Sequence, residues 1–94
     1  MHEIRAEETS KLKIGELDFG VGNIWKNENG KIVARIHPPR KSELYDELGE
    51  YFDFNEGDTF RIGKHTYLID KIVNGKELEN GRRENGHILI RKQE

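Results

Sequence analysis

The side chains best suited to chemistry in this sequence are a run of carboxylates. Residues 43–58 contain seven acidic residues and no basic ones, namely Glu43, Asp46, Glu47, Glu50, Asp53, Glu56 and Asp58. A pair of carboxylates can act as acid and base in glycoside hydrolysis, but such pairs usually line a deep cleft in a larger protein. Clustered carboxylates can also steer a basic partner by long-range attraction. The acidic run is therefore the strongest functional signal in the chain.

The acidic run is interleaved with aromatic and aliphatic residues, which favours recognition over catalysis. Tyrosine is one of the residue types that anchor protein interfaces. We therefore predict a partner-binding surface formed by Glu43, Asp46, Glu47, Glu50 and Tyr51. By analogy with small acidic proteins that neutralise a basic enzyme, the function would be that of an immunity-like or inhibitor protein. A solvated helix face followed by a buried strand explains the same pattern, and this alternative stays open.

A second group of residues combines aromatic and basic side chains. Trp25 is the only tryptophan, and Arg35 lies ten residues further along. Such a pair could stack on single-stranded nucleic acid, but nucleic-acid-binding domains tend to be clearly basic and this chain has a pI of about 6.1. The alternative function is a small-ligand or nucleotide site, in a pocket or at an oligomer interface, with candidate residues Trp25, Arg35, Arg61, Arg82 and Arg83.

Catalytic and metal motifs are not evident in the sequence. The four histidines, at positions 2, 37, 65 and 87, do not have the local spacing of zinc ligands. The segment that begins at Asp53 faintly resembles a calcium loop, but its sixth and twelfth positions hold Asp58 and Lys64 instead of Gly and Glu. There is no cysteine, and neither serine lies in a nucleophile elbow. We expect no enzyme activity, no metal and no cofactor.

Length and composition indicate a single domain spanning residues 1–94. The absence of cysteine fits a reducing cytoplasm, and no apolar run has the length of a signal sequence or a membrane span. The net charge of −2 conceals the local acidic run. We expect a cytoplasmic protein that does not bind membranes, as a monomer or a small homo-oligomer, with another protein as its partner.

Alternating apolar residues and turn signals predict the elements that position these side chains. Four Asn-Gly dipeptides, at 29–30, 74–75, 80–81 and 85–86, suggest type I′ hairpin turns. One hairpin is expected over Val21–His37, and a second over Thr59–Ile69 turns at Gly63-Lys64. Ser42 can cap a short helix over residues 42–48, which Gly49 would end.

These patterns predict an all-β fold, a small barrel or sandwich of about seven antiparallel strands with at most one short helix. Phe60, Ile62, Tyr67 and Ile69 are expected to share one face of their hairpin in the core. The polar segment over residues 74–86 is expected to form a mobile loop or a short exposed hairpin.

Overall fold

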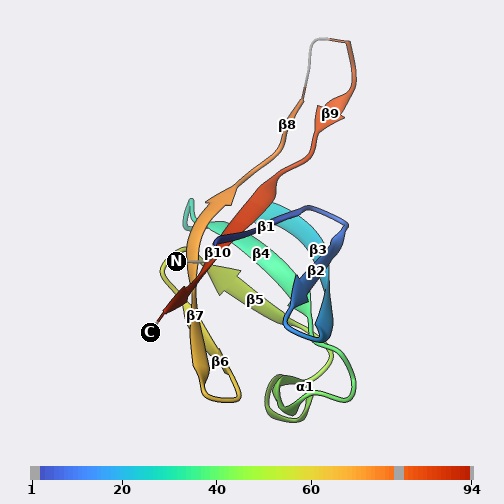
Figure 1. The fold of residues 1–94 in the computed structure, drawn as a ribbon. Coiled ribbons are helices and arrows are strands. Elements are labelled where there is room, and N and C mark those ends of the chain that lie inside the picture. Colours follow the sequence, from blue (N-terminus) through green and yellow to red (C-terminus); the bar gives the residue numbers. More distant parts are fainter. Residues whose placement is uncertain (1–2, 78–79, 94) are drawn as a thin grey trace.

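The computed structural model describes residues 3–77 and 80–93 and is mostly β, with two four-stranded antiparallel sheets (Figure 1). The first sheet has the strand order β1 (Glu3–Glu7), β10 (His87–Gln93), β7 (His65–Val73) and β6 (Thr59–Ile62). The second has the order β2 (Lys11–Ile14), β3 (Leu17–Lys26), β4 (Ile32–His37) and β5 (Phe52–Asn55). The predicted all-β class is confirmed.

The inner faces of the two sheets share one hydrophobic core. Alternate residues of each strand point inward, as the two-residue period of a strand requires. The largest fully buried side chains come from both sheets: Phe19, Leu12, Ile36, Ile69, Ile88 and Ile90. Rings from β5, β6 and β7 stack at one end of this core, with centroids 5.2 Å apart for Phe54 and Phe60 and 5.5 Å apart for Phe60 and Tyr67.

Two tight hairpins set the register of these strands. Ile62 pairs with His65 across Gly63-Lys64, and Gly63 has a φ of 60°, as a type II′ turn requires of its first central residue. This confirms the predicted turn and the shared face of Phe60 and Tyr67. A second two-residue turn follows Ile14, whose partner is Leu17. Because of this turn, even-numbered residues (Leu12 and Ile14) face the core before it and odd-numbered residues (Phe19 and Val21) face the core after it.

The Asn-Gly dipeptides do not form type I′ turns. That turn needs positive φ at both central residues, and Thr9 is the only non-glycine residue with positive φ in the described chain. Gly30 and Gly81 have φ values of 82° and 81°, but the preceding asparagines stay in the ordinary region. The Gly30 N–H donates to the Asn27 carbonyl in the turn between β3 and β4, so this glycine follows an ordinary β-turn.

The predicted helix is confirmed as α1 (Glu43–Leu48). The Ser42 hydroxyl accepts a hydrogen bond from the Tyr45 N–H, and the Gly49 N–H donates to the Tyr45 carbonyl. Leu44 is the one helix residue buried in the core, whereas Leu48 is 43% exposed. The helix therefore lies on the surface with its acidic side chains toward solvent.

A narrow arm projects from the end of the molecule opposite α1 (Figure 1). Its strands are β8 (Lys76–Glu77) and β9 (Arg83–Glu84), which pair in the antiparallel sense. The expectation of a short exposed hairpin is confirmed for the described part, and residues 78 and 79 lie outside it. The described chain has no helix long and apolar enough to cross a membrane.

Candidate interaction surface

A bidentate ion pair lies on the outer face of the second sheet. Arg35 on β4 stands opposite Asp53 on β5. The Arg35 Nε donates to Asp53 Oδ1 at 2.9 Å, and its Nη2 donates to Oδ2 at 3.2 Å. The hydrogen bond to Asp53 raises the pKa of the Arg35 guanidinium above its ordinary value. This fork fixes the plane of the guanidinium, which a single contact would leave free to rotate.

Two aromatic rings flank the fixed guanidinium. The Cζ atom of Arg35 lies 4.0 Å from the centroid of the Tyr51 ring and 5.3 Å from that of the Trp25 ring. Val33 is the partner of Trp25, which places the tryptophan diagonally across the β3–β4 ladder from Arg35. Both distances are within the range of cation–π attraction. The aromatic groups and the cation thus hold one another in a defined arrangement.

His37 extends this arrangement along β4. Its ring centroid lies 6.1 Å from that of Tyr51. The ring also lies over Gly20 and Gly22 of β3, since a Cβ atom at Gly22 would come within 3.2 Å of the His37 Nε2. The two glycines therefore leave room for the histidine against the sheet. We call the four residues Trp25, Arg35, His37 and Tyr51 the aromatic–arginine platform.

The predicted acidic residues directly precede Tyr51 of this platform in the chain. Glu43, Asp46, Glu47 and Glu50 are all exposed, and none makes an ion pair within residues 3–77 and 80–93. Tyr51 follows them directly and is 47% exposed. The chain therefore brings Tyr51 of the predicted acidic surface against Arg35, which belongs to the alternative ligand set.

The remaining candidates of the alternative ligand set are not brought together. Arg61 lies on β6, near the turn at the α1 end of the molecule, whereas Arg82 and Arg83 belong to the arm at the other end (Figure 1). A single phosphate cannot contact these arginines and the platform together within one chain.

Sequence reasoning missed two members of the surface. The sequence did not assign Asp53 or His37 a role beside Arg35. In the structure, Arg35 pairs with Asp53, and Ile36 pairs with Phe52, which places His37 and Tyr51 opposite each other. Their shared outward parity on β4 and β5 was the available signal.

The calcium-like segment forms a turn in which Asp58 Oδ2 accepts from the Asn55 N–H. No group of potential metal ligands gathers in the described residues.

Comparison of the chain with protein-family models, characterised proteins and solved structures found no match.

Proposed function

We propose that this protein is a non-enzymatic binding module that recognises a basic surface of another protein. The acidic helix and the adjoining aromatic–arginine platform form its recognition surface, and its mode of action is that of an immunity-like or inhibitor protein. The observation that carries this proposal is the exposure of Leu48 and Tyr51 beside four carboxylates. These two are the only large hydrophobic residues exposed in the described chain.

The composition of the platform supports recognition of a protein. Tryptophan, tyrosine and arginine dominate the residues whose truncation weakens protein interfaces most. Here Trp25, Arg35 and Tyr51 are already held together before a partner binds. Their ordering costs little at association, which is the advantage of a preorganised surface.

The charge of the surface specifies the partner's chemistry. Asp53 neutralises Arg35, and no basic residue within residues 43–58 compensates the carboxylates of Glu43, Asp46, Glu47 and Glu50. A surface rich in lysine or arginine would relieve their mutual repulsion and be attracted over several ångströms. Exposed rim charges of this kind act chiefly on the association rate.

The same proposal includes the finer architecture and the place of action. We infer a sandwich, because β1 to β10 divide into separate hydrogen-bonded sheets in the described chain. A cytoplasmic site of action fits the absence of cysteine.

A ligand site that joins Trp25 and Arg35 to Arg61, Arg82 and Arg83 is less well supported, because these last three arginines lie at opposite ends of the molecule.

The test uses two charge-matched variants as bait for affinity capture from the source cell, followed by kinetics with the purified partner. One variant combines Glu47→Lys with Glu50→Lys on the acidic surface. The control combines Glu16→Lys with Glu28→Lys in exposed turns, which changes the net charge equally. A third variant, Tyr51→Ala, removes the exposed ring.

We expect the Glu47/Glu50 variant to associate at least about tenfold more slowly at low salt, and Tyr51→Ala to dissociate faster. Raising the salt concentration should slow the wild type but hardly change the reversed variant. The control should bind as the wild type does. Equal slowing in both charge variants would show that only net charge matters, and unchanged binding in all three would refute the assigned surface.

A further inference from the structure

A pocket with only basic and neutral polar lining lies at the end of the first sheet, away from the aromatic–arginine platform. It has a volume of about 480 Å³ and is lined by Lys64, His65, Thr66, Lys92 and Gln93. Lys64 belongs to the β6–β7 turn, and the others come from the paired ends of β7 and β10. The concavity is open to solvent and has room for a small anion.

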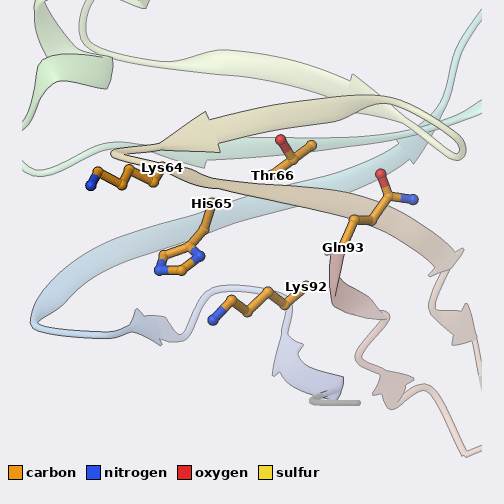
Figure 2. A pocket seen from close by; sticks show the side chains of 5 residues that line it. All are labelled: Lys64, His65, Thr66, Lys92 and Gln93. Carbon is orange, nitrogen blue, oxygen red and sulfur yellow. The ribbon is translucent and has the colours of Figure 1, made fainter.

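The strand register places two of the basic side chains, His65 and Lys92, on the same face of the first sheet. Tyr67 pairs with Lys92, and His65 precedes Tyr67 by two residues on the same face of β7. Ile90 precedes Lys92 by two residues and is fully buried. The apolar inner face of the sheet thus gives way to His65 and Lys92 where the core ends. Figure 2 shows both side chains extending on the same side of the strands, opposite Thr66 and Gln93.

The nearest carboxylates along these strands are engaged on the other face. Arg91 Nε lies 3.2 Å from Glu3 Oε2 and 3.2 Å from Asp70 Oδ2. Arg91 adjoins Lys92 in β10 and therefore points to the opposite face of the sheet. Within the described chain, Lys64, His65 and Lys92 have no ion pair. Within residues 3–77 and 80–93, no carboxylate pairs with the positive charge that lines this pocket.

We propose that this pocket binds the phosphate group of a small phosphorylated molecule. Lysine acts as a point charge toward phosphate oxygens, and a histidine ring N–H can donate a further hydrogen bond. Two lysines and a histidine around one concavity suit a compact anion with several acceptor oxygens. The site is independent of the acidic surface, and nothing in the proposed protein recognition requires it.

Titration with inorganic pyrophosphate, followed by backbone amide NMR at constant ionic strength, tests the site directly. The same titration with inorganic phosphate and with sulfate distinguishes a phosphate chain from a general dianion. The test variant combines Lys64→Gln with Lys92→Gln. The control combines Lys11→Gln with Lys13→Gln, two exposed lysines of β2 that alternate with buried residues. Overlay of the spectra without ligand shows whether each variant retains the fold.

We expect saturable shifts confined to residues 64–66 and 92–93 in the wild type and in the control. The Lys64/Lys92 variant should bind pyrophosphate about tenfold more weakly, and sulfate should bind the wild type more weakly than pyrophosphate does. Shifts that do not saturate, spread over all surface lysines or persist unchanged in the Lys64/Lys92 variant would overturn the site. Failure here leaves the recognition of a basic partner untouched, because that test uses a different surface.

Discussion

The carboxylate of Glu8 accepts a hydrogen bond of 2.9 Å from the backbone N–H of Ile24, which belongs to the other sheet. Its second oxygen accepts from the Gly86 N–H at 3.2 Å. Glu8 is only 3% exposed. The bulge between Val21 and Ile24 interrupts the β3–β4 ladder, and the carboxylate satisfies a donor there. One side chain thus joins the end of β1, the bulge of β3 and the start of β10.

Replacing Glu8 should therefore cost much more than its surface neighbours. Glu8→Ala leaves two buried N–H groups without this acceptor, so we expect a loss of about 2–4 kcal/mol in the free energy of unfolding, measured by urea denaturation. Glu7→Ala is the matched control, since Glu7 is exposed on β1, and should change stability by less than about 0.5 kcal/mol. Equal losses in the two variants would contradict the role assigned to Glu8.

Gly86 should be the least replaceable glycine at this junction. A Cβ atom there would overlap the carbonyl oxygen of Val73 and lie 3.0 Å from the Gly75 nitrogen. We expect Gly86→Ala to destabilise the protein by about 2–3 kcal/mol, because the backbone itself must move. At Gly20 the nearest atom to a new Cβ is 3.5 Å away, so Gly20→Ala is the control with a small effect. The melting temperatures of both variants, measured by thermal denaturation, test this prediction. Similar melting temperatures would contradict the close approach of Gly86 to the Val73 carbonyl.

These two residues show where sequence reasoning ends. Glu8 continues the inward parity of Ile4 and Ala6, so alternation alone could have marked it as buried. Its acceptor role could not be predicted, because Ile24 and Gly86 reach it only through the packing of two sheets. The Asn-Gly dipeptide at 85–86 wrongly predicted a type I′ turn, also because tertiary packing cannot be read from the sequence. A glycine is needed at position 86 because a Cβ atom there would overlap the Val73 carbonyl oxygen.

The hairpin around Gly63 shows the opposite case. Alternation over β6 and β7 suffices to predict its turn and its buried face, because both are local properties. Helix α1 was predictable from Ser42 and Gly49 for the same reason. The sequence grouped Trp25 with Arg35, but it could not place Tyr51 beside them, since the three residues meet only through the register of three strands and a connection that contains α1.

Phe60 should be a major contributor to stability. It is 7% exposed and lies between the rings of Phe54 and Tyr67. Phe60→Ala removes both ring contacts and leaves a cavity, so we expect a loss of about 3–5 kcal/mol. Thr59→Ala, at the exposed neighbouring position, should cost far less. A loss below about 1 kcal/mol for Phe60→Ala in a urea melt would mean that this face does not carry the core.

The intrinsic fluorescence of Trp25 can report the arrangement of the platform. Trp25 is the only tryptophan, and the Arg35 guanidinium lies over its ring. Arg35→Ala should shift the intrinsic fluorescence of Trp25, because a cation at its face is replaced by water. Arg35→Lys should shift it similarly, since lysine cannot form the planar fork with Asp53. Arg61→Ala is the control without contact to the platform. Emission spectra identical to the wild type in both Arg35 variants would rule out the preorganised stack.

Both Arg35 variants should remain folded. The ion pair is open to solvent, with 37% of the Arg35 side chain accessible, so its loss should change the free energy of unfolding only slightly. The fluorescence change therefore reports local geometry and not unfolding, which a urea melt on the same samples verifies.

The charges of α1 should act on stability with opposite signs at its two ends. Glu43 and Asp46 lie in the first turn, where negative charge is favourable, and the last turn carries no basic residue. Glu47→Lys with Glu50→Lys places positive charge near the carboxyl end and relieves repulsion, so we expect a gain of about 0.5–1 kcal/mol at low salt. Glu43→Lys with Asp46→Lys changes the net charge equally but should destabilise by a similar amount.

Urea melts at low and high salt should show the difference in stability between the two variants shrink as screening increases. Equal shifts in both variants would mean that only self-repulsion of the acidic surface matters, and no shift in either would mean that these carboxylates are too well solvated to sense the helix.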